Sequence, residues 1–126
     1  MHESIDGFEM PPPQVVDLAA TILRLVGEPT RLAILWALTQ GETNVGCLAE
    51  LAGTTPTAVS QHLSRLRLAG VVTTRREGTY VYYSIANPHL SRLLVDAIEH
   101  TAHHEPGVDT ALAAVTATLD HGTSDR

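Results

Sequence analysis

Hydrophobic residues recur at helical spacing along the first half of this chain. The pattern predicts helices over Val15–Val26, Pro29–Leu38, Val45–Ala52 and Thr57–Ala69. Gly27, Gly53 and Gly70 follow three of these segments, and glycine is the residue that most often ends a helix. Asn44 stands where it can cap the third segment. The folded part of the chain is therefore expected to begin as a series of short helices.

Alternating residues and β-formers predict two strands after the fourth helix. The strands span Val71–Arg75 and Tyr80–Ile85 and are joined through Arg76–Thr79 as a hairpin. Pro88–His104 is expected to be a helix, because a proline is tolerated in its first turn and its apolar residues recur at helical spacing. Val108–Leu119 is apolar and rich in alanine, and it is expected to form a last helix before a polar tail.

The order helix, short helix, turn, helix and hairpin is that of a winged helix-turn-helix. The fold class is therefore expected to be mainly α with a small β-hairpin, and the fourth helix is expected to read DNA. Residues 1–12 should form a flexible N-terminal arm, 13–105 the winged domain, and 106–126 a C-terminal tail. Trp36 should pack between helices. The apolar positions of the fourth helix that should face the core are Val59, Leu63, Leu66 and Leu68.

Composition narrows the class of protein. The chain has 126 residues, of which 44% are hydrophobic, enough for one small domain with a modest core. No apolar run approaches the length of a membrane span, and the N-terminus lacks the basic start and apolar centre of a signal peptide. Cys47 is the one cysteine, so no internal disulfide can form. We expect a cytoplasmic protein that does not enter a membrane.

The distribution of charge favours nucleic acid, although the net charge of −6 does not. The interval 54–83 contains four of the eight arginines and a single glutamate, which makes a local balance of +3. Those arginines are Arg65, Arg67, Arg75 and Arg76. An isolated run of this kind is usually a solvated face, but here it coincides with the helix-turn-helix and the hairpin. We therefore expect double-stranded operator DNA to be the partner.

The expected DNA contacts follow from the geometry of a reading helix in the major groove. Short polar side chains near the helix start approach base edges; they are Thr55, Thr57, Ser60, Gln61, His62 and Ser64. Arg65 and Arg67 should reach phosphates or a guanine. Arg75 and Arg76, taken as the hairpin tip, should reach the minor groove or the flanking backbone. A packed or phosphate-facing role suits His62 better than metal ligation.

Three histidines share one stripe of the Pro88–His104 helix. The eleven residues from His89 to His100 return to within roughly 20° of the same direction but separate the rings by roughly 16 Å. His100 and His103, one turn apart, can hold an ion together, and His89 can join them only from an antiparallel second copy of the helix. The spacing indicates a metal site and a two-fold dimer together. The alternative is a polar dimer seam that holds no ion.

Several segments closely resemble the ArsR/SmtB family of metal-sensing repressors. They are Pro29–Leu35, Thr57–Leu66, Ala69–Val72 and Arg75–Tyr83, and the likeness runs from about Val15 to His104. The resemblance implies a homodimer formed through the N- and C-terminal helices, which leaves operator DNA when it binds a metal ion.

The resemblance also indicates where the ion would lie. The cysteine site of some members is not matched, because Asn44 stands in place of its first cysteine and Cys47 is better explained as a core thiol. The site on the last helix is matched by His89, His100 and His103, with Asn87 where the family has aspartate. Further donors are His104, Glu105 and His2. A donor set rich in nitrogen and oxygen favours nickel or cobalt, with zinc as the alternative, and is similar to the actinobacterial nickel/cobalt sensors.

Three other classes of function are alternatives to a metal-responsive repressor. An enzyme is not expected, because no general base stands beside the histidines and no nucleophile elbow or phosphate loop is present. No small organic substrate is expected either. A winged-helix regulator that answers to another signal, or to none, would have the same fold. A protein-interaction module would differ in leaving no footprint on DNA.

Overall fold

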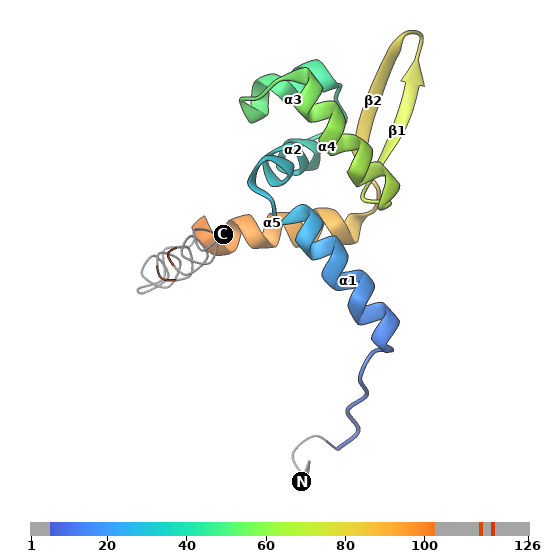
Figure 1. Cartoon of the computed structure of the whole chain (residues 1–126), viewed down its shortest axis with the longest axis vertical. Helices are drawn as coiled ribbons and strands as arrows, with labels where there is room; N and C mark the ends of the chain where they lie inside the picture. Colours follow the sequence, from blue (N-terminus) through green and yellow to red (C-terminus); the bar gives the residue numbers. More distant parts are fainter. Residues whose placement is uncertain (1–5, 103–113, 115–116, 118–126) are drawn as a thin grey trace, which may run out of the picture.

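The computed structural model describes residues 6–102, together with 114 and 117 (Figure 1). Its elements are α1 Pro13–Val26, α2 Pro29–Thr39, α3 Val45–Ala52, α4 Pro56–Leu68, β1 Val72–Glu77, β2 Tyr80–Ile85 and α5 Pro88–Ala102. The prediction of a mainly helical winged helix-turn-helix is confirmed. Of the predicted helix over Val108–Leu119, the structure describes residues 114 and 117, which are helical, and the rest lies outside the described residues, as do the first residues of the predicted arm.

Side chains cap the helices of the helix-turn-helix. The Glu28 carboxylate accepts bonds from the N–H groups at the start of α2, and the Asn44 side chain accepts one from Cys47 at the start of α3. Gly53 then ends α3 in the left-handed conformation, with φ of 67°. Thr55 caps α4 in the same way as Asn44 caps α3. These caps place α3 and α4 as the sequence predicts, and α3 has the predicted bounds.

One core joins α2, α3 and α4 to the base of the hairpin and to α5. Its fully buried side chains are Ile34, Leu35, Leu48, Val59, Leu63, Leu66 and Val71. Leu94 of α5 is 2% exposed and belongs to the same cluster. From α1, only Val26 at its end is buried. Figure 1 shows the N-terminal part of α1 projecting away from the other helices.

The hairpin has a shorter turn than the predicted one. Arg76 and Glu77 belong to β1, where Arg76 pairs with Val81 and Glu77 with Tyr80. The predicted connection through Arg76–Thr79 is therefore wrong, because Gly78 and Thr79 alone make the turn. Gly78 has φ of 61°, and a two-residue hairpin turn requires such a left-handed conformation.

The base of the hairpin is tied to the loop before α3. Thr43 and Tyr83 exchange two backbone hydrogen bonds, of 3.2 and 2.8 Å. This bridge adds a short third partner to the two-stranded sheet. The hairpin, hereafter the wing, is therefore fixed to the helix-turn-helix by backbone as well as by its own strands.

Two large apolar side chains, those of Leu68 and Trp36, are not fully buried. Leu68 is 90% exposed, so its predicted burial is wrong. It follows Leu66 by two residues, and about 200° of helical rotation carries it to the opposite face. Trp36 is half-buried and lines a shallow groove between α2 and α3 that Leu51 also borders.

In the part of the chain that the structure describes, no helix has the length and apolar character needed to cross a bilayer.

Candidate functional site

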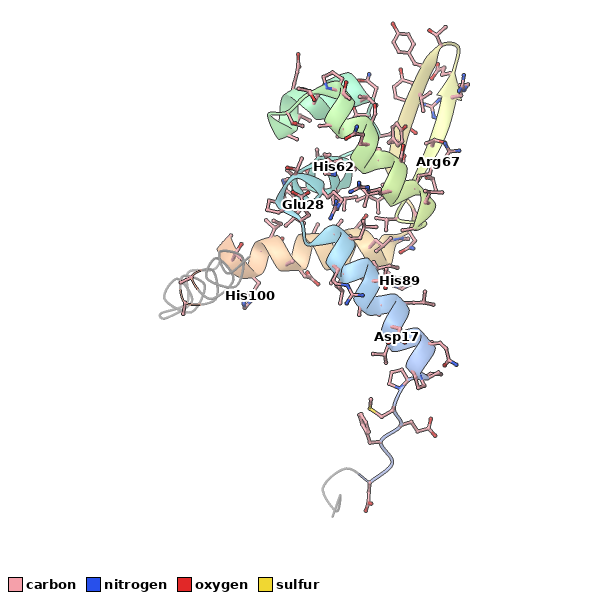
Figure 2. The ribbon with its side chains drawn as sticks, viewed as in Figure 1. Asp17, Glu28, His62, Arg67, His89 and His100 are labelled. Carbon is pink, nitrogen blue, oxygen red and sulfur yellow. The ribbon has the colours of Figure 1, made fainter. Side chains whose placement is uncertain are left out.

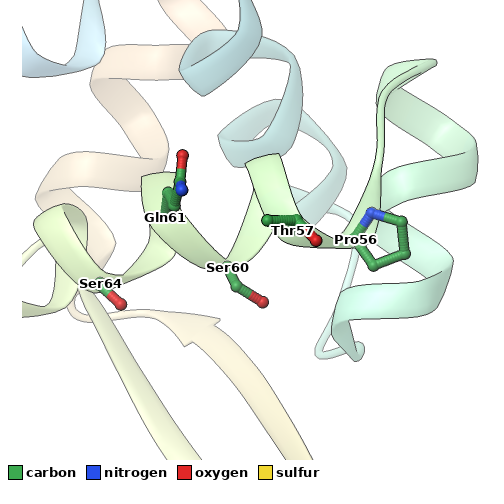
Figure 3. Close-up of a pocket in the computed structure, with 5 residues that line it drawn as sticks. All are labelled: Pro56, Thr57, Ser60, Gln61 and Ser64. Carbon is green, nitrogen blue, oxygen red and sulfur yellow. The ribbon is translucent and has the colours of Figure 1, made fainter.

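The outward face of α4 is polar and shallowly hollowed. Pro56, Thr57, Ser60, Gln61 and Ser64 line an open depression of about 380 Å³ on it. Figure 3 shows the hydroxyl groups of Ser60 and Ser64 on one side of the helix, whereas the Gln61 amide points in another direction. Side chains this short leave room for a base edge to approach the helix. The face can therefore accept and donate hydrogen bonds without steric obstruction.

Two cations and a leucine continue this face in the last turns of α4. Ser64, Arg67 and Leu68 border a second depression beside the first. Arg65 and Arg67 are both exposed, as predicted for residues that could reach phosphates. At the opposite end, the Thr55 hydroxyl accepts the Ala58 N–H at 3.1 Å. Thr55 thus has a capping role in addition to its predicted place beside DNA.

His62 points away from the other predicted DNA contacts. It is half-buried, and its Nδ1 lies 3.5 Å from Nη1 of Arg31. Arg31 also donates from Nε to the backbone carbonyl of Leu25 at the end of α1. His62 therefore lies at the junction of α1, α2 and α4, close to Glu28 in the view of Figure 2. A packed histidine, the alternative already favoured for this residue, agrees with this position.

Glu28 adds a negative charge at that junction. Its carboxylate accepts the N–H of Thr30 at 3.1 Å and that of Arg31 at 2.8 Å. The Arg31 backbone bond is the largest cause that holds the pKa of Glu28 below its ordinary value, and nearby His62 acts in the same direction. The Glu28 carboxyl therefore keeps its charge to a lower pH than an ordinary glutamate.

On the wing, Arg75 has partners that the sequence did not indicate. Its guanidinium lies 2.6 Å from a carboxylate oxygen of Glu42 and 2.8 Å from one of Glu77. It also stacks 4.8 Å from the ring centre of Tyr82. The hydrogen bond with Glu42 is the main reason that the pKa of Arg75 is raised above its ordinary value and that of Glu42 is lowered. Arg75 stands in the strand rather than at the wing tip.

The α5 helix places its histidines on the outward side. His89 and His100 are exposed, and Figure 2 shows them near opposite ends of α5. Leu93 is also exposed at 40%, whereas Leu90 packs against the core that contains Leu94. Asn87 precedes this helix, and its side-chain oxygen accepts the Leu90 N–H at 3.1 Å. Within the part of the chain that the structure describes, the outward face of α5 therefore carries two exposed imidazoles and one exposed leucine.

The remaining predicted donors cannot be placed. His2, His103, His104 and Glu105 lie outside the described residues. Among residues 6–102, with 114 and 117, no three His, Cys, Asp or Glu side chains come close enough to hold an ion. Cys47 is half-buried on α3. Imidazoles on an exposed stripe suit a borderline metal ion.

A second uncovered apolar face lies on α1. Its exposed hydrophobic residues are Val15, Val16, Leu18 and Leu23. Several large apolar side chains gathered on one exposed helix are typical of a surface that another protein covers. Together with the outward face of α5, this surface offers a dimer contact built from the first and last described helices.

The helix-turn-helix is similar to that of known proteins. Residues 28–74, which contain the whole helix-turn-helix, match the bacterial regulatory protein, arsR family. The chain is 39% identical over 97 residues to the HTH-type transcriptional regulator KmtR of Mycobacterium tuberculosis, covering 77% of this chain and 75% of that protein.

Two solved structures are similar in fold. The homodimeric winged helix-turn-helix DNA-binding domain Mb0332 from Mycobacterium bovis superposes with a TM-score of 0.65 at 35% identity, covering 79% of this chain and 97% of that one. The cadmium metal-sensor CmtR from Mycobacterium tuberculosis superposes with a TM-score of 0.55 at 43% identity, covering 61% of this chain and 80% of that one.

Proposed function

Because this chain belongs to the arsR family of bacterial regulatory proteins, we propose that it is a repressor that binds operator DNA as a dimer and leaves it on binding nickel or cobalt. Family membership makes the chain a transcriptional regulator and not an enzyme. The DNA contacts, the dimer and the metal are the parts that the proposal adds. One observation carries the metal response: His89 and His100 lie exposed on the outward side of the same helix.

In the proposed complex, α4 lies in the major groove with its polar face toward the bases. Ser60, Gln61 and Thr57 contact base edges, and Arg65 and Arg67 contact phosphates. The chain has eight arginines and no lysine, so few cations serve each subunit. Two copies of the surface, spaced about 34 Å apart for successive turns of DNA, supply the affinity that one copy lacks.

The dimer is proposed to form through α1 and α5. Leu18 and Leu23 of α1 and Leu93 of α5 are exposed in the single chain and would be covered by a partner. The homodimeric Mb0332 domain supports this association, since it shares the fold over most of both chains. A two-fold axis between paired α5 helices sets His89 of one copy beside His100 of the other.

The ion is proposed to lie between the two α5 helices. Its ligands are His89 from one subunit and His100 and His103 from the other, with Asn87, His104, Glu105 and His2 as further donors. The Asn87 oxygen caps α5, but a carbonyl oxygen has a second lone pair that remains for an ion. Each protein group would donate an imidazole nitrogen or an oxygen to the ion. The bound ion would act as a fixed crosslink between the two subunits.

Nickel or cobalt is preferred because these ions accept more nitrogen and oxygen donors than a four-coordinate zinc site needs. Soft thiolates favour ions such as cadmium, the ion named for CmtR, and this chain has Cys47 alone. Zinc is the alternative, and a site limited to the three histidines and one oxygen would favour it.

Release from DNA is proposed to be a shift between two dimer arrangements. Without the ion, the paired α5 helices allow the two α4 helices to fit successive major grooves. A crosslink between the α5 helices holds the subunits in an arrangement in which the two α4 helices can no longer enter successive major grooves at the same time. To move the dimer from mostly DNA-bound to mostly free, the ion must bind the second arrangement more favourably than the first by about 5.5 kcal/mol.

The test is a titration of purified protein with nickel, cobalt and zinc. Operator duplexes are first selected from a random pool by the metal-free protein, and their binding is then followed by fluorescence anisotropy. We expect nickel or cobalt to release the duplex, and weak visible absorption by the cobalt form to indicate six ligands. The variant His100→Gln should bind the duplex but fail to release it, and Glu99→Gln, its exposed neighbour, should behave like the wild type.

Two results would count against the proposal. Release by no metal, or equal release of the wild type and His100→Gln, would leave a regulator that answers to another signal. Failure to enrich any duplex would reject the DNA-binding role itself.

A further inference from the structure

We propose that Glu42 is a positioning residue for the wing, which holds Arg75 against the helix-turn-helix and leaves Arg76 as the residue that contacts DNA phosphate. The inference rests on the proposed DNA-binding function and does not involve the metal response. It separates two adjacent arginines that the sequence presents as equivalent.

The contacts between Glu42 and Arg75 form a fork on a carboxylate. Nη2 of Arg75 donates to Oε1 of Glu42 at 2.6 Å, and Nε lies 3.2 Å from Oε1 and 3.1 Å from Oε2. Such bidentate pairing fixes the orientation of the Arg75 side chain and balances its charge. Glu77 takes Nη1 at 2.8 Å, and the Tyr82 ring covers one face of the guanidinium. Each of the three guanidinium nitrogens of Arg75 therefore already has a carboxylate partner within the protein.

Glu42 belongs to a different part of the fold from the arginine that it holds. It lies in the loop between α2 and α3, 33 residues before Arg75. The next residue, Thr43, makes the backbone bridge to Tyr83 of β2. Ser84 also donates to Glu42, at 3.4 Å. The side-chain clamp and the backbone bridge thus act together to set the angle of the wing relative to α3 and α4.

Arg76 points the other way. Successive residues of a strand face opposite sides, so Arg75 and Glu77 share the side of Glu42 while Arg76 faces the other. Arg76 is exposed, and no hydrogen bond or ion pair engages its side chain within residues 6–102. Its charge is available to a phosphate without first breaking a contact within the protein.

The slope of affinity against salt distinguishes the two roles. Each phosphate that a cation neutralises contributes about 0.9 to the slope of log K against log salt on duplex DNA. A residue that contacts phosphate changes this slope when it is removed. An arginine that is held by carboxylates within the protein, as Arg75 is, leaves the slope unchanged when it is removed.

The experiment uses the full-length metal-free protein and a mixed-sequence duplex at several salt concentrations. We expect Arg76→Gln to reduce the slope by about two per dimer, one phosphate for each wing. Arg75→Gln should keep the wild-type slope. Glu42→Gln should increase the slope, because it frees Arg75 for a phosphate, and the double variant Glu42→Gln/Arg75→Gln should lose that increase. Glu50→Gln, an exposed carboxylate on α3, controls for the loss of one negative charge.

The outcomes separate this inference from the function on which it rests. Equal reductions of the slope in Arg75→Gln and Arg76→Gln would overturn the inference, as would an unchanged slope in Glu42→Gln. Both results leave DNA binding intact. No measurable binding of the wild type to the duplex at low salt would overturn the inference and the DNA-binding function together.

Discussion

The side-chain oxygen of Asn87 accepts the backbone N–H of Leu90 at 3.1 Å and so caps α5 two residues before His89. The position therefore has a structural role that does not depend on any ion. An aspartate there would accept the same bond and add a charge that favours both a helix N-terminus and a metal ion. The capping role explains how asparagine can occupy the position without disturbing the helix that carries the histidines.

Removing this cap should weaken the fold. We expect Asn87→Ala to lower the free energy of unfolding by about 1 kcal/mol, because the N–H of Leu90 loses its partner. Asn87→Asp keeps an acceptor and should be as stable as the wild type. Urea unfolding followed by circular dichroism measures both. Equal stability of the alanine variant and the wild type would show that the bond contributes nothing to folding.

Mixed dimers test whether the metal site lies between subunits. One subunit carries His89→Gln, and the other carries His100→Gln together with His103→Gln. Each homodimer should fail to release DNA when metal is added. The mixed dimer should regain one complete site, since the first subunit retains His100 and His103 and the second retains His89. Differently tagged subunits allow the mixed form to be purified and titrated with nickel.

A site within one subunit gives the opposite result. Each subunit of the mixed dimer then has a site that lacks at least one histidine, and no metal response returns. Dimers of wild-type subunits, carried through the same tagging and mixing, control for damage by the procedure.

The exposed face of α1 should be needed for dimerisation. Leu18 is 66% exposed in the single chain, and Leu51 of α3 is 65% exposed on another side of the fold. We expect Leu18→Arg to shift the protein to a monomer and to reduce operator affinity at least tenfold, because one reading helix replaces two. Leu51→Arg should remain dimeric. Sedimentation velocity gives the state of each, and a dimeric Leu18→Arg would contradict the proposed interface.

The stability of the fold should fall in acid through Glu28. The pKa of this carboxyl is lowered from 4.5 in the folded chain, chiefly by its bond with the Arg31 N–H. A lowered folded-state pKa stabilises the protein above the unfolded value, and this contribution is lost as pH falls through the folded value. Glu28→Gln should therefore be less stable than the wild type at about pH 6 and should approach it at about pH 3.

Urea unfolding at the two pH values measures the difference. Glu50→Gln, at an exposed position on α3, should match the wild type at both. A gap between Glu28→Gln and the wild type that does not change with pH would mean that the charge of Glu28 contributes nothing.

Most of the secondary structure could be predicted because its signals are local. Asn44 and Gly53 flank the eight residues of α3 directly, and the structure has the predicted bounds. The sequence Asn87-Pro88 carries the same kind of signal, a capping residue followed by proline in the first turn, although we had interpreted Asn87 only as a ligand position. The predicted burial of Leu68 is wrong because the 3.6-residue period of α4 places this residue on the face opposite Leu66.

The candidate site was predictable in its residue types and less so in their partners. The exposed polar face of α4 and the exposed histidines of α5 lie where the periodicity of each helix places them. The sequence could not show that Arg75 is held by Glu42 or that His62 faces Arg31. The length of the turn was predicted wrongly, since a turn of two residues and one of four are both compatible with the sequence between the strands.

The sequence by itself therefore determined the order of the elements, their caps and the face that each helix turns outward. Those features depend on residues within one or two turns of each other. Only the tertiary structure decided which arginine of the wing is held and which is free. That choice depends on a loop that packs beside the wing from 33 residues away, and an ion pair forms wherever folding brings opposite charges within reach.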